Sequence, residues 1–123
     1  MDRLVLGPAM AAPVRPSNDP LAAIRRRFLE MVEGYVLDVA LHRREAETPA
    51  QLRPALAGIA MIAHRVSGVA ATLGHEGLGE TAAALDQKLT QALKSGPLNL
   101  REFDGMIVLF HSALSNTLDE AAT

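Results

Sequence analysis

The feature that most constrains this chain is an apolar period of 3.6 residues, which recurs in four separate segments between residues 20 and 121. Apolar residues at that spacing share one face of a helix, and such a face must be buried against another element. No strand-like alternation, internal repeat or coiled-coil heptad run competes with this pattern. The sequence therefore predicts an all-α chain with these four apolar stripes: Leu21, Ile24, Phe28, Met31/Val32, Tyr35 and Val39; Leu56, Ile59, Ile62/Ala63, Val66, Val69/Ala70 and Leu73; Leu78, Ala82, Leu85, Leu89 and Leu93; Phe103, Ile107, Phe110, Leu114 and Leu118.

Capping residues predict where the first two helices begin and end. Asp19 followed by Pro20 starts the first, which we expect over 20–44. The second starts at the capping box of residues 48–51, Thr-Pro-Ala-Gln, and Gly74 ends it. We expect a kink or a restart near Pro54, because proline inside a helix removes a backbone hydrogen bond.

The last two helices are predicted over about 75–94 and from Asn99 onward, where Glu102 completes a cap pair. Short connections between long amphipathic helices favour antiparallel neighbours. We therefore expect an antiparallel up-down-up-down four-helix bundle over 19–123. Residues 1–18 contain three prolines among small residues, which predicts a flexible, mobile N-terminal tail.

The composition excludes several classes of function. The absence of cysteine removes disulfide scaffolds, thiolate zinc sites and cysteine nucleophiles, and it suits a reducing cytoplasm. A formal net charge of −2 with mixed signs lacks the basic surface of a nucleic-acid binder. No run of about 18 apolar residues is present, so we expect no membrane span.

The outward face of the second predicted helix is unusual, because it carries almost no charge. Glycine inside a helix costs about 1 kcal/mol relative to alanine, yet Gly68 lies one turn after His64 on this face. We expect an open imidazole within a patch of small side chains, against which a protein partner can dock. With Val66 at the centre of the buried stripe, the far side holds Ala57, Ala60, Met61, His64, Gly68, Ala71 and His75, with Ser67 at its edge.

Plainer interpretations of this face remain open. His64 could be an ordinary exposed histidine, and the small residues could form a close helix–helix contact, including one in a homodimer. A shared metal site is not expected, because His64 and His75 lie about 16 Å apart along a helix. The chain also lacks metal-ligand spacings, a glycine-rich phosphate loop and paired catalytic carboxylates. We therefore expect no metal site and no autonomous kinase activity.

Residues 62–74 resemble the signature of histidine phosphotransfer domains. The likeness of the motif extends over about 59–93, and that of the four-helix organisation over about 20–121. One position departs from the family pattern, since Ser67 stands where a lysine is usual. The matching positions are Ala63, His64, Val66, Gly68, Leu73 and Gly74.

The resemblance implies a cytoplasmic, monomeric protein of a two-component phosphorelay. His64 accepts a phosphoryl group from a receiver-domain aspartate and passes it to another. The implied partners are response-regulator receiver domains and a hybrid sensor histidine kinase, with no nucleic acid and no membrane. The receiver supplies magnesium, so the chain itself needs no cofactor. The supporting or docking residues are Arg65, Ser67, Gly68, Ala60, Met61 and Ala71.

The departure at Ser67 bears on the charge of the phosphoryl group. A serine offers a hydrogen bond but no positive charge, so Arg65, Lys88 or the partner has to offset that charge. The serine at position 67 also leaves open an alternative, in which the bundle binds and inhibits a receiver or kinase without using His64. A third hypothesis is a structural bundle that dimerises through its Ala/Gly face.

Overall fold

The computed structural model describes residues 19–122, and within this range every regular element is helical. This confirms the all-α prediction for the described part of the chain. The predicted tail at 1–18 lies outside the described residues. The elements are α2 (Pro20–Glu45), the short 3-10 helix η2 (Pro49–Gln51), α3 (Leu52–Val69), α4 (Glu76–Leu93) and α5 (Leu100–Ala122).

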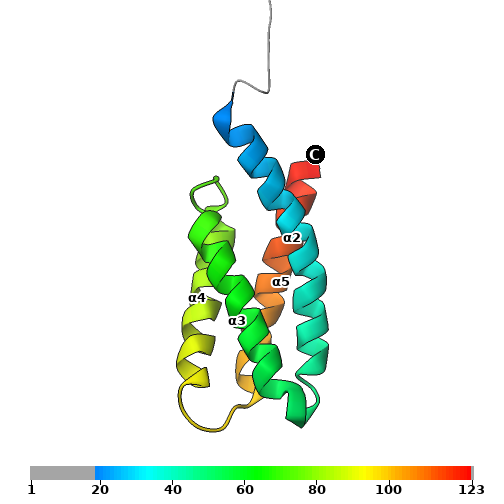
Figure 1. Cartoon of the computed structure of the whole chain (residues 1–123), viewed down its shortest axis with the longest axis vertical. Helices are drawn as coiled ribbons and strands as arrows, with labels where there is room; N and C mark the ends of the chain where they lie inside the picture. The colour runs from blue at the N-terminus through cyan, green and yellow to red at the C-terminus, as the bar shows by residue number, and fades with distance from the viewer. Residues whose placement is uncertain (1–18, 123) are drawn as a thin grey trace, which may run out of the picture.

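The four α-helices pack around one core, in which each touches two neighbours (Figure 1). α2 lies against α3 and α5, and α4 lies against the same two helices. Figure 1 shows the 46–51 and 94–99 connections at one end of the molecule, here called the base, and the 70–75 connection at the other. The largest fully buried side chains come from all four helices: Phe103, Phe110, Leu56, Ile59, Leu85, Leu89, Ile107, Leu114, Val32, Val39 and Val66.

The apolar stripe predicted for the first helix is not fully buried at the start of α2. Phe28 and Val32 are buried, whereas Leu21, Ile24 and Met31 are exposed. In Figure 1 the first turns of α2 rise beyond the 70–75 connection, and lower down Ile24 and Met31 line an open cavity with Arg65 and Val69 of α3. The prediction of a stripe buried along the whole of α2 is therefore wrong at its N-terminal end.

Two of the predicted N-caps are confirmed. The carboxylate of Asp19 accepts a hydrogen bond from the backbone N–H of Leu21 at 2.9 Å. The side-chain oxygen of Asn99 accepts one from the N–H of Arg101 at 3.0 Å. Each cap satisfies a backbone donor that the first turn of a helix leaves without a partner.

Gly74 ends the turn after α3, as the sequence predicts. Its φ of 93° lies in the left-handed region, which glycine adopts without steric cost. The N–H of His75 donates to the carbonyl of Ala70 at 2.8 Å, and that of Gly74 to the carbonyl of Ala71 at 3.1 Å. This pair of bonds is a Schellman motif, so the polypeptide turns sharply into α4.

The prediction that residues 48–51 form a capping box is wrong, because the side chain of Thr48 makes no capping hydrogen bond and the residues after it form η2. The predicted restart exists as a change from 3-10 to α geometry at Leu52, two residues before Pro54. Pro54 therefore lies in the first turn of α3. Its missing N–H costs nothing there, because that position has no partner inside the helix.

Within residues 19–122, none of the helices combines the length and the apolar character needed to cross a membrane.

Candidate functional site

His64 projects from the middle of α3 into solvent. Its side chain is 77% exposed, while its neighbours Ala63 and Val66 are buried in the core. The backbone beneath the imidazole is thus held by packing. The structure places His64 where the sequence predicts an open ring on a rigid helix.

Asp86 of α4 lies opposite this imidazole, and sequence analysis missed it. Nδ1 of His64 is 2.9 Å from Oδ2 of Asp86. The other carboxylate oxygen, Oδ1, accepts a hydrogen bond from the hydroxyl of Thr90 at 3.0 Å. An ionised carboxylate only accepts hydrogen bonds, so Nδ1 of His64 is the donor in this contact, and Nε2 is the ring nitrogen that makes no contact with Asp86.

A shallow, open cavity of about 420 Å³ lies beside this pair, between α3 and α4. Asp86 and Thr90 are four residues apart and so share one face of α4, and the C-cap residue Lys94 follows four residues later on the same side. Lys94 brings a cation to the cavity that His64 borders. The lining consists of His64, Asp86, Gln87, Thr90, Gln91 and Lys94.

Neither Ser67 nor Arg65 lies in this cavity. The hydroxyl of Ser67 donates to the backbone carbonyl of His64 at 2.9 Å, so its proton is used within α3. Arg65 instead lines an apolar cavity of about 260 Å³ with Phe28 and Tyr35 of α2. One residue turns a helix by 100°, and this step carries Arg65 to the α2 side of α3, away from Asp86.

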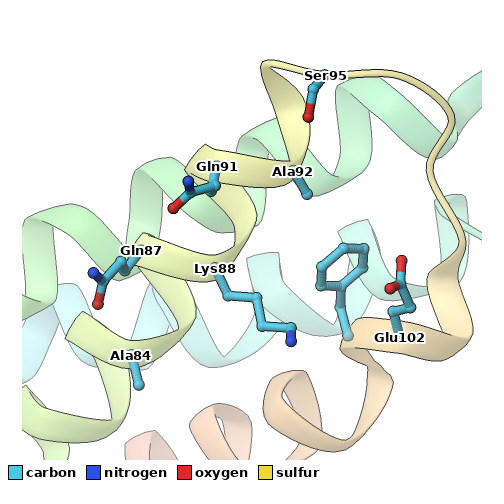
Figure 2. A pocket seen from close by; sticks show the side chains of 8 residues that line it. Ala84, Gln87, Lys88, Gln91, Ala92, Ser95 and Glu102 are labelled. Carbon is cyan, nitrogen blue, oxygen red and sulfur yellow. The ribbon is translucent and has the colours of Figure 1, made fainter.

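Lys88 also points elsewhere. It lines a separate cavity of about 530 Å³ with Phe103 and Glu102. Figure 2 shows its side chain extending from α4 toward α5, on the side where Glu102 lies. Of these two lysines, Lys94 is therefore the one that lines the same cavity as His64.

The surface around His64 is exposed, as predicted, at four of the five small or apolar positions. Ala57, Met61, Gly68 and Ala71 are exposed, and a Cβ added to Gly68 would meet no atom within 4 Å. Ala60 is the exception, because it is only 7% exposed and belongs to the core. It lies about 120° from Val66 around the helix, and the buried arc of α3 extends that far. The prediction that Ala60 faces outward is wrong.

The other three histidines are tied into packing contacts. His75 is half-buried and its ring stacks on Phe28, with centroids 5.7 Å apart, so it is not part of the open face. His42 lies 3.2 Å from the carboxylate of Glu45. His111 of α5 contacts the backbone carbonyl of Val36 at 3.2 Å. His64 alone among the described histidines is mostly exposed.

No group of three or more potential metal ligands comes together among residues 19–122. No protein family, curated protein or solved structure matches the chain. The site thus consists of one exposed imidazole, its carboxylate partner and a lysine that lines the same cavity. Such a set can present a nucleophilic nitrogen.

Proposed function

We propose that this chain is a histidine phosphotransfer protein, which carries a phosphoryl group on His64 between receiver domains. The observation that supports the proposal most strongly is the 77% exposed imidazole of His64, which stands on a packed helix. An antiparallel up-down-up-down order of the helices and a cytoplasmic location are part of the same proposal.

The proposed reaction is a displacement at phosphorus. The lone pair of Nε2 attacks the phosphorus of an aspartyl phosphate on the receiver, and an N–P bond forms. The P–O bond to the receiver aspartate breaks, and its electron pair leaves with the aspartate oxygen. Phosphoryl transfer of this kind depends mainly on positioning and on charge stabilisation. The receiver contributes the magnesium ion, and this chain contributes the nucleophile.

The surface around His64 suits the approach of a second protein. A phosphoaspartate lies within a receiver domain, so its carrier has to come within bonding distance of Nε2. Gly68 leaves the space one turn after His64 empty, and the exposed side chain of Met61 offers an apolar contact. Met61, Gly68 and Ala71 are therefore the proposed docking positions.

Lys94 is the proposed counter-charge for the phosphoryl group. The family pattern supplies a lysine at the position that Ser67 occupies here, and Ser67 uses its proton on the backbone. Lys94 borders the same cavity as His64, and its flexible four-carbon stem lets the ammonium follow a charge in that cavity. In this proposal the cation comes from the C-terminal cap of α4 instead of from α3.

The test is phosphoryl transfer from a panel of phosphorylated receiver domains. We expect an acid-labile, alkali-stable label on the wild-type chain. His64→Gln loses this label, whereas the matched control His111→Gln, a change at a histidine of α5, retains it. Lys94→Gln shortens the lifetime of the label, while Lys88→Gln, in the other cavity, leaves that lifetime unchanged. Absence of label with every receiver in the panel would overturn the proposal.

The second candidate is a docking module that binds a receiver or kinase without using His64. The observation that favours it is Ser67, which provides no cation at the family's lysine position. This candidate predicts that His64→Ala leaves binding and inhibition of the partner unchanged, and that no label forms. Label on His64 decides for the relay.

A further inference from the structure

We infer that two copies of this chain pair through α2, with the two helices antiparallel and related by a two-fold axis. The inference goes beyond the proposed function and does not rest on it, because pairing is a property of the chain alone. It departs from the monomer that the family resemblance implies. It also uses a different surface from the Ala/Gly face of α3.

A second stripe of residues, exposed to solvent, runs along α2 beside the buried one. Its members follow one another at alternating intervals of three and four residues, so they lie within an arc of about 100°. The centre of this arc is about 110° from that of the buried residues Phe28, Val32 and Val39. Residues at this spacing form the contact layers between two paired helices. The stripe, here called the α2 seam, consists of Ile24, Arg27, Met31, Gly34, Asp38 and Leu41.

The apolar members of the α2 seam are unusual for a solvated helix face. Ile24 is 49% exposed, Met31 43% and Leu41 55%. Ile24 and Met31 line the open apolar cavity of about 260 Å³ between α2 and α3, together with Phe28 and Tyr35. A second helix laid along the seam covers the mouth of this cavity and removes its apolar surface from water.

The order of residues along the α2 seam suits a two-fold axis that crosses α2 between residues 32 and 33. In a two-fold interface each contact occurs twice, because residue i meets residue j of the partner and j meets i. Antiparallel helices related by this axis bring all six members of the seam into three kinds of pair. These pairs are Ile24 with the partner's Leu41, Arg27 with the partner's Asp38, and Met31 with the partner's Gly34.

Two of these pairs are complementary in size and polarity. Ile24 and Leu41 are both large and apolar. Gly34 lies inside α2, where glycine lowers helix stability, and a Cβ added to it would meet no atom within 4 Å. The surface at Gly34 therefore leaves room for the long side chain of Met31 from the other copy.

The third pair is complementary in charge. Arg27 and Asp38 are exposed, and neither forms an ion pair with another of the residues in 19–122. Arg65 of α3 lines the same cavity as Arg27 and adds a second cation near the position of the partner's Asp38. Parallel helices would oppose Arg27 to Arg27 and Asp38 to Asp38. The charges therefore select the antiparallel arrangement.

Pairing through α2 leaves the imidazole of His64 accessible. His64 contacts Asp86 on the α4 side of α3, whereas the α2 seam lies beside the opposite side, where Arg65 is found. A dimer of this kind therefore presents two separate imidazoles.

The test is sedimentation equilibrium of the whole chain over about 5–500 µM, where the mean mass should rise from one chain toward two. Arg27→Glu or Asp38→Arg alone places like charges at both symmetric contacts, so each should weaken association at least about tenfold. The double reversal should restore it to within about threefold of wild type. Arg26→Glu, at an exposed arginine outside the seam, is the matched control and should change association less than about twofold.

A second measurement tests the alignment of the two helices with cysteines, which the chain naturally lacks. Ile24 and Leu41 lie about 26 Å apart along one helix, too far for a disulfide within one chain. A mixture of Ile24→Cys and Leu41→Cys should therefore give a disulfide-linked dimer that contains one chain of each, whereas neither variant alone should cross-link.

Three results would overturn the inference. One is a chain that stays monomeric at about 500 µM, whether residues 1–18 or a different protein covers the seam. Another is a double charge reversal that associates no better than either single variant. The third is cross-linking of the single cysteine variants with themselves as readily as with each other.

Discussion

At the base of the bundle, side chains join the ends of the helices to one another. Arg53 of α3 donates to the backbone carbonyls of Leu93 and Gly96, each at 2.9 Å. The guanidinium of Arg43 in α2 donates hydrogen bonds to both carboxylate oxygens of Asp104 in α5, to Oδ2 at 3.0 Å. At the opposite end, the first turns of α2 leave apolar side chains exposed.

Two glycines of α3 show the same difference within one helix. A Cβ on Gly58 would lie 2.6 Å from Nε2 of His42, whereas a Cβ on Gly68 would meet nothing within 4 Å. Near the base, the lack of a side chain at Gly58 lets α3 and α2 approach each other. Beyond His64, the lack of a side chain at Gly68 leaves the surface of α3 open. Side-chain contacts thus join the helices at the base, whereas the surface beyond His64 is left open.

The largest expected effect is on stability, at Gly58. Gly58→Leu should lower the free energy of unfolding by about 2 kcal/mol, because the new side chain overlaps the ring of His42. Gly68→Leu should raise it by about 0.5 kcal/mol, since leucine favours a helix and meets no neighbour. Denaturant unfolding of both variants measures the difference.

The overlap with His42 can be isolated with a double variant. His42→Ala combined with Gly58→Leu should recover part of the lost stability, because the ring that the leucine meets is gone. If Gly58→Leu were as stable as Gly68→Leu, the two halves of α3 would not differ in the way described.

The next effect is on transfer, at Gly68. Gly68→Leu should slow transfer from a receiver at least about tenfold, or about 1.4 kcal/mol, because the side chain occupies the proposed docking surface. Labelling by phosphoramidate should change little, since the small donor does not need that surface. Gly34→Leu, at an open glycine of α2, is the control. Equal rates for the two leucine variants would remove Gly68 from the docking surface.

The smallest effect concerns the ion pair at the base. The hydrogen bond from Arg43 holds the pKa of Asp104 below its ordinary value. A carboxylate with a lowered pKa stabilises the fold above its unfolded pKa of about 3.9, and this contribution is lost as the pH falls through the folded value. Asp104→Asn should therefore cost about 0.5–1 kcal/mol at pH 7, a modest figure because the pair is partly exposed.

The difference between wild type and Asp104→Asn should be constant from pH 7 to about 5 and should close below about pH 4. Thermal unfolding across this range, at one ionic strength, gives the measurement. A gap that widens on acidification would contradict the assignment of the pair to the stability of the base.

Local sequence signals predicted the helices well. Asp19, Asn99 and Gly74 act through atoms only a few residues away, so their roles follow from short patterns. The prediction of a cap at Thr48 was wrong, because a capping pattern does not determine whether the following turn is 3-10 or α. The start of α2 failed for another reason, since burial there depends on how far the neighbouring helices extend.

The site could be predicted only in part. The exposure of His64 and Gly68 follows from their angle around one helix. Asp86 is in contact with His64 only because α4 packs beside α3, and no pattern within either helix gives that alignment. The available signal was weak: an acid beside the buried position Leu85, with Thr90 four residues later. Lys94 needed the same knowledge of how the two helices align.

The contacts of Arg53 have a consequence for the chemistry of the ring. At 1.5 Å per residue, Arg53 lies about 16 Å from His64 along α3, and it binds the carbonyls on either side of Lys94. Because α3 and α4 are both stiff, a contact that joins them at the base determines their axial alignment at the level of His64. A longitudinal slip of a single residue would be enough to stretch the 2.9 Å contact between Nδ1 and Asp86 beyond hydrogen-bond length. Substitution of Arg53 can therefore weaken the hydrogen bond of the His64 imidazole without changing any residue of the site.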